Sequence, residues 1–276
     1  MAQSSVNTGR LNIRSACAAF TISESCYRYQ PKLSDENAVI AEWLVLLTSR
    51  QRNWGFKLCF LYLRNVRGFG WNHKRVYRIY KELGLNHKRR TKKRLPRGER
   101  VPLEVPACPN AIWSVDFVHD TFYSGRRFRT FNVIDEGVRE VLGIEVDTSL
   151  TGGRITRVMD QLKEMYGVPE AIRCDNGPEL LSTPFVTWCE KNGVELRYIQ
   201  PGKPNQNAYI ERFNRTYRDE VLSSYLFEDL DQVREITWGW MQEYNEERPH
   251  ESLGHVPPSV YRRTLEAGNS DIKRFA

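Results

Sequence analysis

The hydrophobic period changes near residue 110, and this change divides the chain into two kinds of structure. Before it, apolar residues recur every three or four positions, as they do in helices. After it, segments of alternating apolar and polar residues predict three strands in a meander, and strands then alternate with helices. We expect strands at 112–118, 127–134, 138–146, 171–174 and 194–199, and helices at 154–165, 184–191, 208–222 and 230–246. This order predicts an α/β fold, in which helices cover a mixed sheet.

The first part of the chain is expected to be all-helical. Residues 10–31 contain two short helical patterns, and Ser23 is a plausible N-cap of the second. A third helix begins near residue 34, and a fourth spans about 56–66. The most regular pattern follows, where Asn72 caps a helix that Gly84 ends.

This last helix carries a basic face. Lys74, Arg75 and Arg78 lie on the side away from its apolar stripe. Two helices joined by a short glycine-bearing turn, the second of them basic, are typical of a helix-turn-helix DNA-binding motif. An ordinary helical hairpin with a solvated basic face is the alternative.

The charge is distributed unevenly along the chain. The whole chain has 41 Lys and Arg against 34 Asp and Glu, a net charge of +7, but residues 1–110 hold 21 basic and 7 acidic residues. Residues 86–100 alone have eight basic residues against one glutamate, and prolines follow. Such a segment repels itself and stays extended unless it is neutralised, for instance along a phosphate backbone. The charge therefore indicates DNA as the partner.

Two classes of protein are excluded by pattern. No apolar run approaches the roughly 18 residues that a membrane span needs, and the polar N-terminus lacks the apolar core of a signal peptide. We therefore expect no membrane association and a location where the chain is made, in the cytoplasm. The six cysteines form no C-x-x-C pair, which argues against structural zinc and favours reduced, mostly buried thiols.

Three carboxylates stand out by their positions. Asp116 lies in the middle of an apolar strand, where an acid is costly without a partner. Asp175 follows the strand 171–174, and Glu211 lies one turn into the helix after the loop 200–206. Acids on strands and on a helix beside them can converge on one pocket, and oxygen-only ligands suit Mg²⁺ or Mn²⁺. Asp120 and Asp135 are rivals for the first position, but they lie near a strand end and at a turn.

Four segments resemble one protein family closely. They are WSVDF (113–117), CDNGPE (174–179), PGKPNQNAYIERFNRTYRDEVL (201–222) and YNEERPHESLGHVPP (244–258). The chain resembles the retroviral-integrase-like transposases of bacterial insertion sequences, of the IS-three type whose second reading frame encodes the catalytic part. The resemblance runs from about residue 53 to 260 and includes the helix-turn-helix segment.

This resemblance implies an RNase H-like integrase core and a catalytic Asp-Asp-Glu triad that binds two divalent ions. By motif position the triad is Asp116, Asp175 and Glu211. Leu180 stands where the motif usually has an aromatic residue, and Cys174 where serine is frequent. The family further implies DNA cleavage and strand transfer, a multimer on DNA, a nucleoid-associated location, and an upstream-frame (OrfA) product as partner.

Further site residues are predicted around the triad. Lys203, Arg215 and Arg218 are expected to contact DNA phosphates, although Lys203 can equally be a solvated loop lysine. Asn176 and Gln206 are expected to position the site, with a purely turn-shaping role as the alternative for Asn176. The RPH segment at 248–250 can approach the site or pin the last helix.

The predicted organisation has four parts. They are a helical DNA-binding region (1–85), a basic proline-bearing linker (86–110), an RNase H-like integrase core (111–265) and a C-terminal tail (266–276). The sequence thus predicts a DDE transposase. The alternatives are an RNase H-like nuclease that cleaves without joining, and a DNA-binding regulator with an inactive core.

Overall fold

The computed structural model describes residues 2–9, 11–29, 35–86, 106, 108–200 and 204–268. The linker and tail predictions fall largely outside these residues, and Lys203 lies outside them entirely. The chain divides into two compact units, Met1–Trp43 and Leu44–Ala276. The boundaries predicted at residues 85, 110 and 265 stay predictions.

The first unit is built of short helices. α1 (Ala2–Asn7) precedes α2 (Ile13–Ala19) and α3 (Glu24–Arg28), and α4 (Glu36–Arg50) crosses the boundary between the units. The Ser23 hydroxyl accepts a hydrogen bond from the backbone N–H of Cys26, so Ser23 is the N-cap of α3 as expected.

After the end of α4, the second unit continues with the predicted pair of helices. α5 (Phe56–Leu61) continues into a π-helical turn at Tyr62–Val66, and α6 (His73–Glu82) follows. The Asn72 side chain accepts from the N–H of Lys74 at 2.9 Å, and Gly84 adopts a left-handed φ of 68° just beyond the helix. The ring of Phe56 packs edge-on against Tyr77 and Tyr80 of α6.

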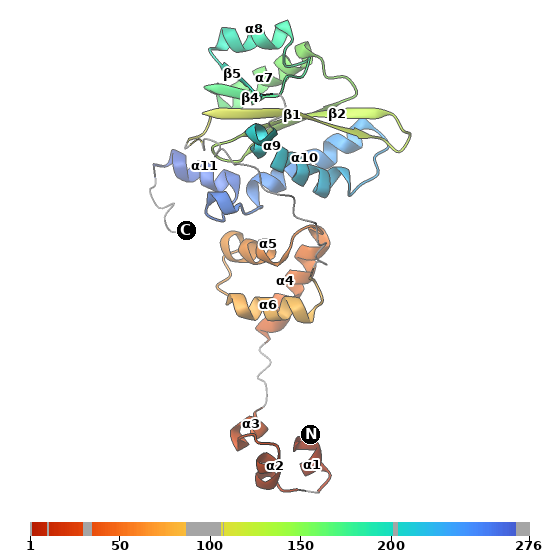
Figure 1. The fold of residues 1–276 in the computed structure, drawn as a ribbon, viewed down its shortest axis with the longest axis vertical. Helices are drawn as coiled ribbons and strands as arrows, with labels where there is room; N and C mark the ends of the chain where they lie inside the picture. The colour runs from red at the N-terminus through yellow and green to blue at the C-terminus, as the bar shows by residue number, and fades with distance from the viewer. Residues whose placement is uncertain are drawn as a thin grey trace. The chain divides into compact units, whose positions relative to one another are not determined.

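A five-stranded mixed sheet forms the centre of the second unit (Figure 1). The order is β3-β2-β1-β4-β5, and β1, β2 and β3 are antiparallel neighbours. β4 pairs parallel with β1, and β5 with β4. The strands are β1 (Ile112–Thr121), β2 (Arg127–Asp135), β3 (Val141–Asp147), β4 (Ala171–Cys174) and β5 (Glu195–Tyr198). This topology confirms the expected α/β fold.

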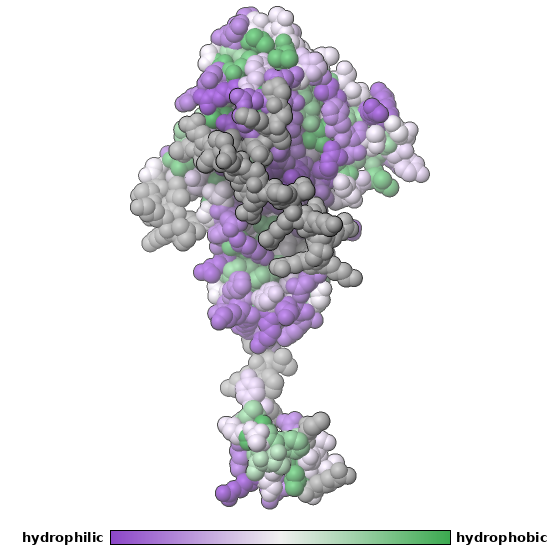
Figure 2. All heavy atoms as spheres, viewed as in Figure 1, coloured by the Kyte–Doolittle hydropathy of each residue, from purple (hydrophilic) through white to green (hydrophobic). Residues whose placement is uncertain are grey.

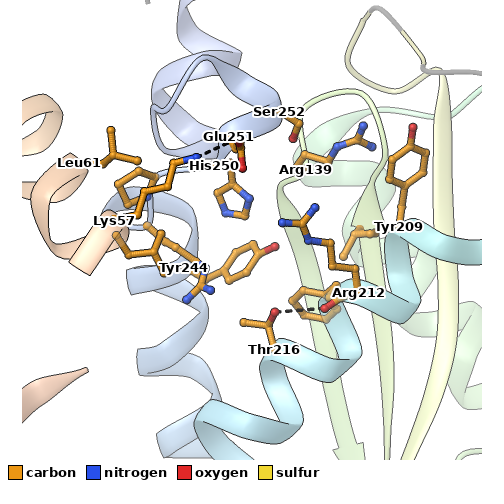
Figure 3. Close-up of a pocket in the computed structure, with 15 residues that line it drawn as sticks. Lys57, Leu61, Arg139, Tyr209, Arg212, Thr216, Tyr244, His250, Glu251 and Ser252 are labelled. Carbon is orange, nitrogen blue, oxygen red and sulfur yellow. Dashed lines mark hydrogen bonds and ion pairs between the residues drawn. The ribbon is translucent and has the colours of Figure 1, made fainter. Parts of the chain in front are cut away.

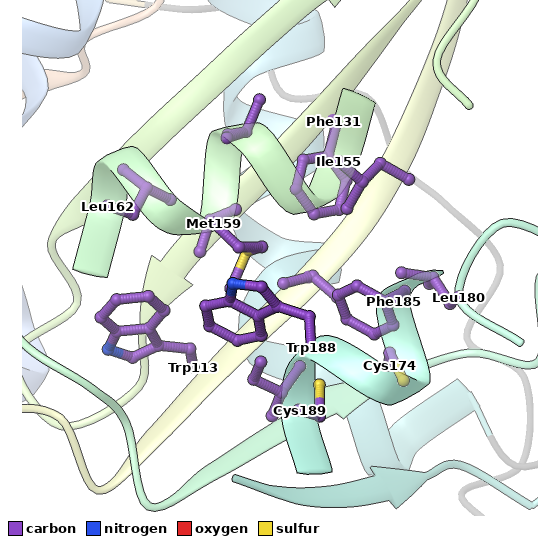
Figure 4. Packing of buried hydrophobic residues seen from close by; sticks show 14 of the residues in the cluster. Trp113, Phe131, Ile155, Met159, Leu162, Cys174, Leu180, Phe185, Trp188 and Cys189 are labelled. Atoms are coloured by element: carbon purple, nitrogen blue, oxygen red, sulfur yellow. The ribbon is translucent and has the colours of Figure 1, made fainter. Parts of the chain in front are cut away.

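Each face of the sheet is covered by a separate helical layer, because side chains on β1 alternate between the two faces. Trp113 and Val115 pack under α7 (Gly152–Tyr166) and α8 (Thr183–Asn192), where Trp188 and Met159 complete the cluster (Figure 4). On the other face Val118 meets α9 (Ala208–Tyr217), which continues as a π-helical turn to Leu222, and α10 (Leu230–Glu246). Figure 1 shows the two layers on opposite sides of the strands.

A last helix, α11 (Pro258–Glu266), was not predicted from the sequence. Its Arg262 forms ion pairs with Glu140 and with Asp135, whose carboxylate is fully buried at the end of β2. These ion pairs hold α11 against the end of β2 and the turn that follows it. Figure 2 shows that hydrophilic residues cover much of the visible surface around the sheet, and no helix in the described part of the chain is long and apolar enough to cross a membrane.

Candidate active site

The pairing of β1 with β4 determines where two of the predicted carboxylates lie. The two strands are parallel, with Ser114 opposite Arg173. Two residues further along each strand come Asp116 and Asp175, the latter just past the end of β4. Since side chains alternate and neighbouring strands lie about 4.8 Å apart, these carboxylates occupy adjacent positions on one face. The Arg173 guanidinium donates to the backbone carbonyl of Gln206 at 2.9 Å, so this face is the one on which the segment leading to α9 packs.

Helix α9 is attached to this face by a chain of polar side chains. The Asn214 amide donates to Asp116 Oδ2 at 2.7 Å, and Asn214 Oδ1 accepts from the Asn132 amide at 2.7 Å. Glu211 is one turn before Asn214 and therefore lies on the same face of the helix. Ile210 and Phe213 bury the adjacent face in the core. The third predicted carboxylate thus comes from α9, on the side that contacts β1.

The three carboxylates influence one another electrostatically. Burial raises the pKa of Asp116 to about 6, and hydrogen bonds from the Phe117 N–H and Asn214 oppose the shift. The negative charges of Asp175 and Glu211 also contribute to this raised value. Within the described ranges, no three Asp, Glu, His or Cys side chains converge closely enough to hold an ion together. The donors are carboxylate oxygens, the kind that hard cations prefer.

The turn after β4 is ordered by side-chain hydrogen bonds. Asp175 Oδ1 accepts from the N–H of Gly177 at 3.0 Å, so it is Asp175 that shapes this turn. The Asn176 amide donates instead to the carbonyl of Ile199 at 3.1 Å. Gln206 Oε1 accepts from the N–H of Gln200 at 2.8 Å, across the loop that precedes α9. The Asn176 bond connects the Asp175 turn to Ile199, and the Gln206 bond connects the next residue, Gln200, to the segment just before α9; the positioning role of both side chains stays a prediction.

The two arginines that are predicted to contact DNA phosphates, Arg215 and Arg218, have different surroundings. Arg218 donates to the carbonyl of His119 at 3.0 Å and lies 3.7 Å from Asp120, so it already binds the end of β1. Arg215 is exposed and lines an open cleft beside Phe117 and Asn214.

The basic residues of α6 are also on its outer side. Lys74 and Arg78 are exposed, Arg75 is half-buried, and Arg78 lies 3.7 Å from Glu82 of the same helix. Lys74 forms no ion pair with any residue that the structure describes. DNA contact by these residues stays a prediction.

The two rival acids, Asp135 and Asp120, are bonded to groups other than the three predicted carboxylates. Asp135 is fully buried, accepts from the backbone N–H groups of Asn110 and Gly137, and pairs with Arg262. Asp120 accepts from the N–H of Thr121 and pairs with Arg218. The sequence analysis did not single out Asn214 or Asn132. Asn214 could have been found in the sequence by its position three residues after Glu211. Asn132 could have been found as an asparagine at a core-facing position of β2.

Comparison with known proteins identifies the family of the chain. Two family models, both described as an integrase core domain, match residues 106–204 and 192–258. An insertion element IS407 protein of Burkholderia multivorans is 40% identical over 248 residues, which cover 90% of this chain and 89% of that protein. An insertion element IS476 protein of Xanthomonas euvesicatoria is 37% identical, over 94% of this chain and 76% of its own length.

One solved structure supports the fold independently of sequence. A simian T-cell lymphotropic virus intasome, solved in complex with the PP2A regulatory subunit B56 gamma, superposes with a TM-score of 0.51 at 17% identity. The match covers 79% of this chain and 73% of the matched chain. Together with the relatives above, it shows that the chain belongs to the family of insertion-element transposases built on an integrase core.

Proposed function

We propose that the chain is a DDE transposase in which Asp116, Asp175 and Glu211 are the catalytic carboxylates. It cuts DNA at the ends of its insertion element and joins the resulting 3′-hydroxyl to a new phosphodiester. The observation that carries this proposal is the β1–β4 register, which makes Asp116 and Asp175 neighbours, together with the Asn214–Asp116 hydrogen bond, which brings the Glu211 face of α9 to them.

The residues fit a pair of divalent cations by chemistry and by charge. All three donors are carboxylates, and the pKa of Asp116 is raised by burial first and then by the negative charges of Asp175 and Glu211, which a bound cation would offset. When bound, Mg²⁺ or Mn²⁺ ions supply activation of the attacking oxygen and stabilisation of the leaving oxygen in an in-line displacement. The ligands would be Asp116, Asp175 and Glu211.

The protein's own residues have separate tasks in this scheme. β1 and β4 hold two carboxylates on a rigid backbone, and α9 supplies the third. Asn214 fixes the orientation of the Asp116 carboxylate by donating to it. Water is the nucleophile of the cleavage step and the 3′-hydroxyl that of the joining step, so neither step needs a nucleophilic serine or tyrosine. The family resemblance further supports joining of one element end to the other, followed by integration of an excised circle.

The same proposal assigns the DNA contacts. Arg215, Arg218 and Lys203 bind phosphates near the catalytic carboxylates, and the basic face of α6 binds DNA through Lys74, Arg75 and Arg78. The active form is a multimer on DNA, with an upstream-frame (OrfA) product as an additional partner.

Incubation with Mg²⁺ and labelled element-end DNA tests the function directly. Joined products support the transposase, cleavage without joining supports an RNase H-like nuclease, and binding alone supports a regulator. Asp175→Asn is expected to lower joining by about two to three orders of magnitude while DNA affinity is unchanged, because only the reaction needs the carboxylate. Glu164→Gln, an exposed carboxylate on α7 in the opposite layer, is the matched control. Residual joining near the wild-type rate in Asp175→Asn refutes the assignment.

A further inference from the structure

A second polar site lies on the other side of α9 from the carboxylates. A cavity of about 270 Å³ is lined by Tyr209, Arg212 and Thr216 of α9, which recur at helical spacing on the face away from Asn214. The wall opposite comes from α5 and from the segment after α10, residues 248–252. Figure 3 shows side chains from these three elements pointing into a common space.

The charges that line this cavity are not balanced. Lys57 pairs with Glu251 at 2.8 Å, and Arg248 pairs with Glu220. The remaining two cations, Arg139 and Arg212, form no ion pair with any residue that the structure describes. Two unneutralised guanidinium groups at one cavity repel each other, and this repulsion is relieved when an anion lies between them.

Two neutral groups face the same space. His250 Nε2 is buried and has no hydrogen-bond partner among the described residues, and the ring lies edge-on to Tyr244. In Figure 3 the Arg212 guanidinium lies beside this ring, and the Tyr244 hydroxyl points toward the same space. Burial and then the positive charges of Arg248, Arg212 and Arg139 together lower the pKa of His250 to about 3. The imidazole is therefore neutral at physiological pH and can donate one hydrogen bond.

The backbone holds Arg139 in an unusual conformation. Its φ is 58°, in the left-handed region that a non-glycine residue rarely adopts. Its guanidinium lies 3.6 Å from the centroid of the Tyr209 ring and donates to the carbonyl of Glu136. A strained backbone and a stacked guanidinium together fix the side chain at the rim of the cavity.

We propose that this cavity binds a phosphate group. Arg139 and Arg212 supply the charge, and the Tyr244 hydroxyl and the His250 N–H supply directional donors. Guanidinium forks match the geometry of phosphate oxygens, and the partly apolar walls strengthen each charge-assisted bond. The phosphate is either a phosphodiester of the DNA strand or a free phosphate ion. Of these two alternatives, only binding of a DNA phosphodiester rests on the proposed function; binding of a free phosphate ion does not.

Two arms of one experiment distinguish these sources in the full-length chain. In the first, thermal melting is followed with increasing inorganic phosphate at constant ionic strength. Phosphate is expected to raise the Tm of the wild type in a concentration-dependent way. Arg212→Gln should abolish that rise, whereas Arg157→Gln, an exposed arginine on α7 with no role in the cavity, should retain it. Arg139→Asn tests the second cation with a side chain that tolerates the left-handed backbone.

In the second arm, DNA affinity is measured as a function of salt concentration. Loss of one phosphate contact lowers the slope of log K against log salt by about one unit. A lower slope in Arg212→Gln but not in Arg157→Gln assigns the site to a DNA phosphate. An unchanged slope with a lost phosphate-dependent Tm rise assigns it to free phosphate.

The proposal is overturned if phosphate raises the Tm of Arg212→Gln as much as that of the wild type and the salt slope is also unchanged. Because the first arm needs neither DNA nor catalysis, it can succeed even if the transposase assignment fails. Arg212 is exposed and outside the core, so its replacement leaves a folded chain whose circular dichroism spectrum serves as the check.

Discussion

Replacing Asp116 by asparagine is expected to stabilise the protein while it abolishes DNA joining. The folded state raises the pKa of this carboxyl from 3.8 to about 6, mainly through burial and then through the charges of Asp175 and Glu211. A shift of about two units corresponds to about 3 kcal/mol of destabilisation when the group is ionised. Asparagine removes the charge but cannot accept both hydrogen bonds that Asp116 accepts, which costs about 1 kcal/mol. The net gain at neutral pH is therefore about 2 kcal/mol.

The sign of the pH dependence follows from the two pKa values. As pH rises, the carboxyl ionises first in the unfolded chain, near 3.8, and only near 6 in the folded chain. The destabilisation therefore begins above the unfolded pKa and is complete above the folded pKa. At about pH 4.5 the penalty is about 1 kcal/mol, which the lost hydrogen bond offsets, so Asp116→Asn and wild type should then be equally stable.

Thermal melts of the full chain with a chelator present measure this difference. A gain of about 2 kcal/mol raises the Tm by about 4–8 °C at about pH 7.5. Added Mg²⁺ should narrow the gap, because it stabilises the wild type and not the variant. A variant that melts below the wild type at neutral pH, or a difference in Tm that does not change with pH, would refute the reasoning about buried negative charge.

Three further outcomes are expected. Arg262→Met leaves the buried Glu140 carboxylate without its cation and should cost about 3–5 kcal/mol near neutral pH; urea unfolding measures this, and adding Glu140→Gln should restore part of it. Asn214→Leu removes the donor to Asp116 and should lower the joining rate about 10–100-fold without weakening DNA binding, as single-turnover joining and gel-shift assays can show. Gly137→Ala places a Cβ 2.2 Å from a backbone carbonyl oxygen, so the turn must shift and the Tm should fall, with unchanged melting as the contrary result.

Much of the sheet domain was predictable because its signals are local. The strand Ala171–Cys174 and the helix Leu230–Glu246 have the bounds expected from the apolar pattern. β3 begins at Val141 rather than 138, because the Asp135 carboxylate accepts from the N–H groups of Gly137 and Val138 and extends the turn. Two short segments, α1 and α11, were not predicted. α11 is held by the long-range Arg262 pairs, which no local pattern shows.

The candidate site was partly predictable for a different reason. Motif position identified Asp116, Asp175 and Glu211, but the sequence alone could not show what orients them. The Asn132–Asn214–Asp116 chain joins residues that are distant in sequence, so only the folded chain reveals it. The sequence likewise predicted Arg218 as a phosphate contact, but it did not show the bonds of Arg218 to the end of β1. The role of the RPH segment was open, and its Arg248 and His250 line the cavity behind α9.

The parallel ladder between β1 and β4 also restricts which length changes the gene can tolerate. Deleting or inserting one codon between those of Trp113 and Asp116 would invert every later side chain of β1, which would send the carboxylate under α7 and a core residue to the face that α9 covers. A change of two codons would keep the orientation but move the acid about 6.6 Å along the strand, past its neighbour on β4. Length variation in this family should therefore be confined to the loops, such as the one between β1 and β2. In such a loop the number of residues does not determine the position of any proposed catalytic carboxylate.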